Sequence, residues 1–337
     1  MPTLDVFKAD AFSLTSLTAA ILKAPYQPRR IGQLGLFDEQ PITTTTVMVE
    51  EKDGLLTLIP TSPRGGVPDT IGKPKRTARS FAVPHLARES HINADEVQNV
   101  RAFGSENEVE GVQTLVNRQL SFLRSMQEVT LEHLRIGAIK GVINDSDGTT
   151  PIYNLFTEFG VEQQTKSMVL GTTTTDVRAK CVEIIEQVED ALGAAAYTGI
   201  RAFCSSAFFA ALIGHGEVKE TFKYQEGDVL RRDLRNGFVF GGITWEVYRG
   251  SVGGVSFVEA DYAYVFPEGV LTEKGGLFTT YFAPADFMET VNSPGLPMYA
   301  KQAVDPEFQR FVKIHSQSNP LPLCLMPRTV VKAYKSS

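Results

Sequence analysis

The sequence predicts an α+β protein in which a projecting β-ribbon and one very long helix flank a central domain of mixed helices and strands. Apolar residues recur at helical spacing over residues 106–140, and β-like runs border a Gly- and Pro-rich stretch within residues 43–86. Helical patterns and short β-like runs alternate over residues 146–299. With 337 residues, 42% hydrophobic and 21% charged, the composition excludes disordered, collagen-like and coiled-coil rod proteins.

Residues 1–42 predict an extended N-terminal arm. They hold one short apolar patch, Phe12 to Leu22, followed by a stretch rich in Pro and Arg from Pro25 to Arg30. A segment of this kind has little core of its own. We therefore expect it to be covered by partner surfaces.

Residues 43–86 predict a long ribbon. Two β-like runs, Ile42 to Glu50 and Leu55 to Ile59, flank Asp53-Gly54, which is a typical hairpin turn pair. A Gly- and Pro-rich loop follows, and a third β-like run lies between Lys75 and Val83. Because the ribbon has little core, its apolar side chains require cover from a neighbouring subunit. The side chains expected to make such contacts are Val47, Val49, Leu56, Leu58 and Phe81.

Basic residues concentrate on this ribbon. The formal charge of the chain is −6, of which residues 61–90 contribute +4 and the remainder −10. Binding of single-stranded nucleic acid favours aromatic side chains between the basic ones, and only Phe81 is near. We expect docking on the acidic surface of a neighbouring copy, with a solvated ribbon face and nucleic-acid contact as the alternatives. The basic side chains concerned are Lys73, Lys75, Arg76 and Arg79.

Residues 106–140 predict one helix of roughly 52 Å, as long as the diameter of about 50 Å expected for a compact chain of this size. Such an element favours a flat plate over a sphere, although Gly111, Gly137 and Gly141 are places where the helix could end early. We expect the ribbon or the arm on its second apolar side. One apolar stripe is Val109, Val112, Val116, Leu120, Leu123, Leu131, Leu134 and Ala138, and the second is Leu115, Phe122, Met126, Val129 and Ile136. The remaining, polar arc is Glu110, Asn117, Arg124, Glu128, Glu132 and Arg135.

The rest of the chain predicts ordinary α+β structure. Helices are expected over Thr174 to Ala196 and over Ser206 to Gly214, with Ser206 as the N-cap of the second. Strands are expected at Ile200 to Cys204, Phe238 to Phe240 and Thr244 to Arg249. After residue 300, β-like runs at Phe311 to His315 and Thr329 to Ala333 predict two returning strands.

No catalytic, cofactor-binding or metal site is predicted. The stretch Gly66 to Pro74 resembles a phosphate-binding loop but has the wrong glycine spacing. The turn Asp145 to Gly148 lacks the distant acid of a calcium loop, and the five histidines show no metal-ligand spacing. Ser205 and Ser206 lack the glycines of a nucleophile elbow. Three scattered cysteines predict buried thiols in a cytosolic product, and neither a signal peptide nor a membrane-spanning run is recognised.

The order of arm, ribbon, long helix, central domain and returning strands resembles the major capsid proteins of tailed bacteriophages with the Hong Kong 97-like fold, more narrowly the lambda-type family. Local matches are Lys73-Pro74-Lys75, Asp305-Pro306-Glu307-Phe308 and Ser318-Asn319-Pro320-Leu321. The resemblance implies an extended loop at 43–86, a peripheral domain at 87–145 and 300–337, and an axial domain at 146–299. It also implies a structural protein without catalysis or cofactor, forming hexamers and pentamers of an icosahedral shell.

The resemblance further implies partners and a location. The shell would enclose double-stranded DNA without sequence-specific binding and without a membrane. A scaffolding protein and a portal would assist assembly in the host cytoplasm, and a decoration protein is left open. Two other functions stay open at this stage: a shell protein of an encapsulin-type bacterial nanocompartment, or a cytosolic enzyme with an unrecognised site in residues 146–299.

Overall fold

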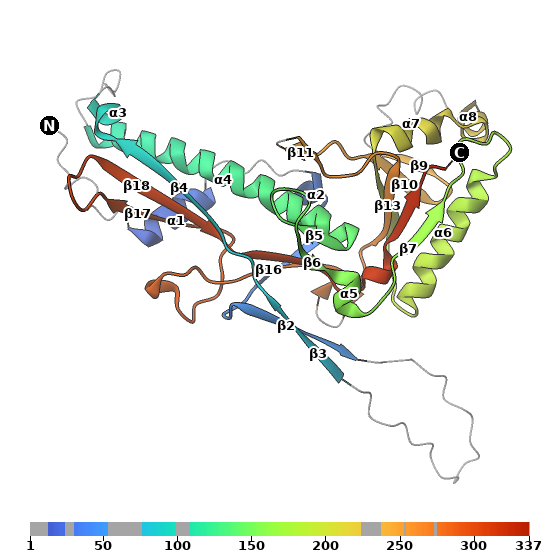
Figure 1. The fold of residues 1–337 in the computed structure, drawn as a ribbon, viewed down its shortest axis with the longest axis horizontal. Coiled ribbons are helices and arrows are strands. Elements are labelled where there is room, and N and C mark those ends of the chain that lie inside the picture. Colours follow the sequence, from blue (N-terminus) through green and yellow to red (C-terminus); the bar gives the residue numbers. More distant parts are fainter. Residues whose placement is uncertain are drawn as a thin grey trace, which may run out of the picture.

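The computed structural model describes residues 13–23, 30–52, 76–98, 108–223, 237–252, 254–272 and 275–336. These residues form an elongated molecule in which the long helix α4 (Glu108–Lys140) connects a small sheet at one end to a larger sheet at the other (Figure 1). Helices and strands are mixed along the chain, which confirms the predicted α+β class.

Helix α4 matches the predicted long helix, except that residues 106 and 107 lie outside the described residues. It continues through Gly111 and Gly137 and ends before Gly141, whose φ is +84°. A Cβ at Gly137 would lie 3.0 Å from Ile143 Cα, so glycine allows strand β5 (Val142–Asn144) to pack directly on the helix. The glycines therefore serve packing and termination and do not shorten the helix.

The first half of α4 packs on the sheet that we call the spine sheet, of order β17 (Tyr299–Val304), β18 (Phe311–Ser318) and β4 (Leu86–Asn93). All its strand pairs are antiparallel. Helix α1 (Leu14–Lys23) covers β17, where Thr18 Oγ1 contacts both the amide and the carbonyl of Ala300. Helix α3 (Ala94–Gln98) follows β4. The apolar core here comprises Leu17, Ile21, Ile92, Val116, Leu120, Leu123, Met298, Ala300 and Ile314.

A second sheet, the middle sheet, lies beside the centre of the molecule and has the order β1 (Phe37–Pro41), β16 (Phe278–Phe282) and β19 (Pro320–Cys324). β1 pairs with β16 in parallel, and β19 pairs with β16 antiparallel. After α4, the hairpin of β5 and β6 (Pro151–Asn154) leads into α5 (Leu155–Phe159), which Asn154 caps. The turn Asp145 to Gly148 closes this hairpin.

The largest sheet, the central sheet, has the order β7 (Gln164–Ser167), β20 (Val331–Tyr334), β13 (Tyr262–Glu268), β8 (Gly199–Cys204), β10 (Ile243–Val247) and β9 (Phe238–Phe240). Helices α6 (Val177–Leu192), α7 (Ser206–Gly214) and α8 (Gly216–Lys223) accompany it. The N-cap of α7 is Ser205, whose side chain accepts from Phe208 N, so the prediction of Ser206 is wrong by one residue.

Short elements complete the described residues. The two-residue strands are β11 (Ser251–Val252), β12 (Val255–Ser256), β14 (Leu271–Thr272) and β15 (Gly275–Gly276), and the 3-10 helices are η5 (Met288–Thr290) and η6 (Pro327–Thr329). Within the described ranges, no helix is both long and apolar enough to cross a membrane.

The N-terminal arm differs from its prediction as an extended segment. In its described part, α1, α2 (Arg30–Leu34) and β1 all lie on the body of the same chain. They leave Phe122, on the second apolar stripe of α4, 61% exposed, whereas Ile136 of the same stripe is buried. The reason is that polar residues of α4, described below, hold the arm.

The C-terminal strand also lies elsewhere than the resemblance implies. β20 pairs with β13 and β7, so it belongs to the central sheet and not with the peripheral segment 300–337. β17 and β18 belong to the spine sheet, on which α4 packs.

The three cysteines are free and buried, as predicted. Burial raises the pKa of the Cys181 and Cys324 thiols to about 12 and also raises that of Cys204. A thiol reacts as its thiolate, so all three are both protonated and shielded at neutral pH.

We therefore expect a thiol reagent at about pH 8 to leave the folded protein unlabelled and to label it fully in denaturant. Mass spectrometry measures the labelled fraction. Rapid labelling of any of these cysteines in the native protein would contradict the described burial.

Gly141 offers a stability test. A Cβ at this position would lie 2.3 Å from the Phe156 ring, and the residue also has a positive φ. Gly141→Ala is expected to lower the free energy of unfolding by about 1–3 kcal/mol, measured by denaturant titration of the unassembled subunit. Gly214→Ala is the matched control, because no atom lies within 4 Å of its Cβ position. Equal stability of the two variants would refute this account.

Candidate intersubunit surface

The base of the predicted ribbon consists of β2 (Thr46–Lys52) and β3 (Arg76–Ala82), which pair antiparallel and run away from the body (Figure 1). The first β-like run therefore pairs with the third. The turn Asp53-Gly54 and the second run lie outside the described residues, as do Leu56, Leu58, Lys73 and Lys75.

One face of the ribbon base is covered by the same chain. Phe81 is fully buried and contacts the rings of Tyr153 at 5.4 Å and Phe159 at 5.8 Å. Val47 and Val49, on the same face, are also buried. The prediction that a neighbouring subunit covers these three side chains is wrong, because they are already buried within their own chain. For Phe81, the cover comes from β6 and α5.

Arg79 belongs to this covered face, opposite Val49. Its NH2 donates to the carbonyl of Phe159 at 3.2 Å, and its guanidinium lies 5.5 Å from the centre of the Phe159 ring. Arg79 thus contacts Phe159 of its own subunit, whereas the sequence predicts an intersubunit contact for it. Of the basic cluster, Arg76 lies at the far end of β3, paired with Lys52.

The opposite face of the ribbon base is open. Met48 is 65% exposed and lies across from Ser80, between exposed residues of small size on β3. Backbone groups on the outer edges of β2 and β3 pair with no further strand among the described residues. An exposed methionine on a narrow ribbon with open edges is typical of a surface that packs against another chain.

A second apolar projection is the loop 283–297 between β16 and β17. Met288 is 92% exposed, Val291 61% and Leu296 39%. A strip of three apolar side chains this exposed on one short loop indicates a contact surface. Sequence reasoning missed this strip, because isolated apolar residues in a Pro-containing loop carry no periodic signal.

The loop is nevertheless rigid. Asn319 Nδ2 donates to Pro284 O at 2.7 Å, and Ser318 Oγ donates to Pro297 O at 2.6 Å. Thr290 Oγ1 donates to Ala285 O at 2.7 Å. At Gly295 a Cβ would lie 2.0 Å from Phe282 O, so only glycine fits. The motif Ser318-Asn319-Pro320-Leu321 therefore fixes the loop in place, which reduces the entropy lost when the loop binds a partner.

Between this loop and the ribbon base lies a groove of about 360 Å³. Its floor is polar, with His85 Nδ1 3.1 Å from Asn319 Oδ1. Its walls are largely apolar and include Val83, Pro284, Phe287, Met288 and Val291.

The described residues show no arrangement typical of catalysis. No group of metal-ligating side chains is found within the described ranges. His133 and His215 contact the carbonyls of Asp145 and Thr172, both at 3.0 Å, which is the structural role predicted for them.

Comparison with known proteins gives the functional context of these surfaces. The family model of phage major capsid protein E matches residues 13–335. The chain belongs to the phage major capsid protein E family. It is 32% identical to the major capsid protein of Pseudomonas phage KPP10, over 95% of this chain and 96% of that protein. It is 25% identical to the major capsid protein of Salmonella phage Felix O1 (isolate Felix O1-VT1), over 95% of each chain.

Solved structures agree on the fold. The crystal structure of the putative capsid protein of a prophage of E. coli CFT073 matches with a TM-score of 0.57 and 14% identity, over 97% of this chain and all of that one. The Hong Kong 97-like fold and the resemblance to major capsid proteins are thereby confirmed. As a member of the phage major capsid protein E family, the chain is a structural protein of the phage head and is located in the virion capsid. Of the functions considered from the sequence, the comparisons thus support the phage capsid protein.

The two faces of the ribbon base should respond differently to truncation. Phe81→Ala is expected to lower the free energy of unfolding of the unassembled subunit by about 3–5 kcal/mol, because it empties a filled core position. Met48→Ala, at the exposed position, should change it by at most about 0.5 kcal/mol. Denaturant titration measures both values. A small effect of Phe81→Ala would mean that the ribbon base does not pack on α5 as described.

Proposed function

We propose that this major capsid protein assembles into hexamers and pentamers of an icosahedral head that encloses double-stranded DNA, without any catalytic step. The observation that carries the proposal is the exposure of Met48 and Met288 on two rigidly anchored projections. An isolated subunit gains nothing from exposing such side chains in fixed positions, whereas neighbouring copies bury them.

In this proposal the segments divide the work of assembly. Residues 43–86 form an extended loop that lies on the adjacent subunit, and α4 with the spine sheet forms the peripheral part. Residues 146–299, together with β20, form the axial part at the centre of each capsomer. Each contact is of standard size, and several contacts per subunit make the closed shell hard to dismantle.

Charge supports the docking of the extended loop. Lys73, Lys75 and Arg76 are the members of the basic cluster that remain for intersubunit contacts, since Arg79 binds within its own subunit. The last turns of α6 expose the carboxylates of Glu186, Glu189 and Asp190 on the proposed axial part. Unlike charges steer association and fix its register.

The remaining partners follow from the same proposal. A scaffolding protein and a portal would guide assembly, and a decoration protein would bind the finished head. The formal charge of −6 limits the non-specific attraction of the wall to packaged DNA. The proposal includes no sequence-specific binding of that DNA.

Electron microscopy of particles from cells that produce the protein with its neighbouring phage genes tests the proposal. Closed icosahedral particles containing DNA are expected. A small oligomer with a bound cofactor would contradict the proposal in favour of an enzyme, and particles filled with a cargo protein would favour a nanocompartment.

The basic cluster provides a specific prediction. Lys73→Gln combined with Lys75→Gln should leave the subunit folded but reduce the yield of closed particles severalfold, with a weaker dependence of assembly on salt. Sedimentation and circular dichroism measure the two properties. The double variant Arg178→Gln with Lys219→Gln, at exposed positions on α6 and α8, controls for loss of charge alone. Assembly equal to that of the unmodified protein at every salt concentration would remove the cluster from the interface.

A further inference from the structure

The polar residues of α4 are buried beneath the N-terminal arm. Glu128, Glu132 and Arg135 are each less than 9% exposed. The helical pattern predicts these residues on the polar arc of the helix. Charged residues are stable in a buried position only when they are paired. We call Arg124, Glu128, Glu132 and Arg135 the polar stripe. It binds three successive elements of the arm.

The first element is the C-terminal end of α1. Arg124 NH1 donates to the carbonyls of Ile21 at 2.7 Å and Leu22 at 2.6 Å, and Arg124 Nε pairs with Glu128 at 2.6 Å. A positive charge at a helix C-terminus is favourable, because the last carbonyls there have no helical partner.

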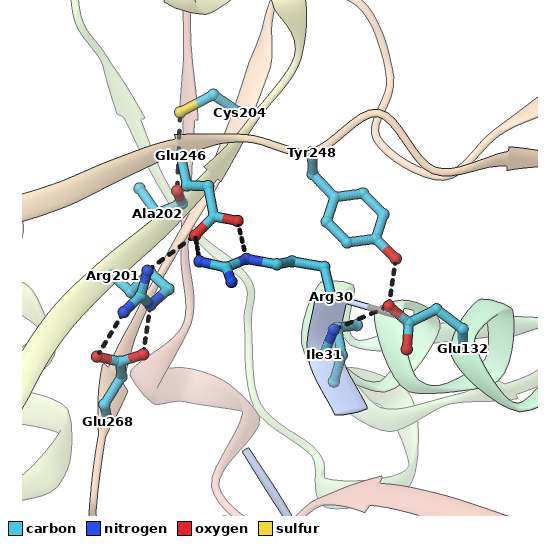
Figure 2. A network of polar contacts seen from close by, with 9 residues as sticks. All are labelled: Arg30, Ile31, Glu132, Arg201, Ala202, Cys204, Glu246, Tyr248 and Glu268. Carbon is cyan, nitrogen blue, oxygen red and sulfur yellow. Dashed lines mark hydrogen bonds and ion pairs between the residues drawn. The ribbon is translucent and has the colours of Figure 1, made fainter. Parts of the chain in front are cut away.

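The second element is the N-terminal end of α2. Glu132 Oε1 accepts from the backbone amide of Ile31 at 2.9 Å and from the hydroxyl of Tyr248 at 2.7 Å (Figure 2). Negative charge is favoured at this end of a helix. Each charge of the stripe thus matches the end of the arm helix that it contacts.

The third element is β1. Arg135 NH2 donates to Glu39 at 2.8 Å, and the Arg135 guanidinium lies 5.4 Å from the centre of the Phe37 ring. The arm is therefore fixed along α4 at three points, one after another in the order of the chain.

The arm also reaches the central sheet. Arg30, at the start of α2, makes a two-pronged ion pair with Glu246 of β10, and its NH2 lies 2.8 Å from Glu246 Oε2. Glu246 is buried and accepts in addition from Arg201 NH1 at 2.8 Å, while Arg201 pairs with Glu268 of β13 (Figure 2). The hydrogen bond with Glu246 raises the pKa of Arg30, so its guanidinium stays charged.

These contacts give α4 two attachments to the central sheet. Near its last turn, Lys140 pairs with Glu259 and lies 5.9 Å from the centre of the Tyr264 ring. The last turns of α4 also share an apolar core with the central sheet, but apolar packing depends little on direction. With Lys140 as the only polar contact, the helix could still rotate about this end. The contacts at Glu132 lie eight residues, roughly 12 Å, away along the helix, and so oppose that rotation.

We propose that residues 30–41 act as a brace that fixes the angle between α4 and the central sheet, and with it the curvature of the shell. The brace resists change because any rotation separates buried Glu132, Glu246 or Arg135 from the arm group that it binds. Two-pronged arginine pairs accept a narrow range of geometry, which makes the brace specific for one angle. This proposal rests on the proposed assembly into closed shells.

The test cuts the brace at each end. Arg30→Gln removes the contact with the central sheet. Glu132→Ala removes one of the two contacts with α4, at Ile31, and leaves the contact of Arg135 with Glu39. We expect each variant to replace uniform particles by a broad range of diameters in electron micrographs, and to cut the yield of full-size shells severalfold.

Three comparisons complete the experiment. Arg30→Lys, which keeps the charge, should restore part of the full-size yield, and Arg178→Gln controls for loss of an exposed arginine. Uniform particles of unchanged diameter from Arg30→Gln would overturn the proposal. Should Glu132→Ala fail to fold, Arg30→Gln decides alone, since Glu246 keeps Arg201. Absence of closed particles from the unmodified protein would instead contradict the proposed function.

Discussion

The burial of α4 in two separate cores is the interaction on which the rest of the structure depends. Its first half packs through Leu120 and Leu123 on the spine sheet and α1. Its last turns, including Ile136 and Ile139, enter the larger core that also contains the central sheet. A single helix therefore carries both halves of the molecule, and the middle of that helix has to be held by something other than an apolar core.

Polar contacts hold the middle of the helix, and they explain why the arm follows the helix so closely. A purely apolar contact would tolerate sliding, since burial depends on area and hardly on direction. Helix ends and carboxylates impose directions and distances. The arm therefore binds to α4 in only one register. The residues that make these contacts thereby set the angle between the two halves of the subunit.

Much of this architecture is predictable from local pattern, and the failures have a common physical origin. The long helix, the strands of the ribbon base and the helices of the central part follow from periodicity and from turn residues. The helical pattern places the polar stripe on the arc opposite the apolar stripes but cannot reveal its burial. The partners of Glu132 and Arg135 in the arm lie about a hundred residues away in the sequence. The prediction of intersubunit contacts for the ribbon base fails for the same reason. Strand alternation separates the two faces of the ribbon but does not reveal that α5 covers the face of Phe81. The apolar loop at Met288 has no periodic pattern in the sequence, so only the fold reveals that its side chains are exposed.

The pairing of distant segments has a consequence for biosynthesis. β1 lies beside β16, which is made more than two hundred residues later, and α1 needs β17 as its support. The arm of a nascent chain can contact α4 early, but α1 and β1 lack their strand partners until β16 and β17 have been made. Prematurely terminated chains lack β20 and leave the central sheet open between β13 and β7. The central sheet is therefore complete only when the chain has been made to the end of β20 at Tyr334.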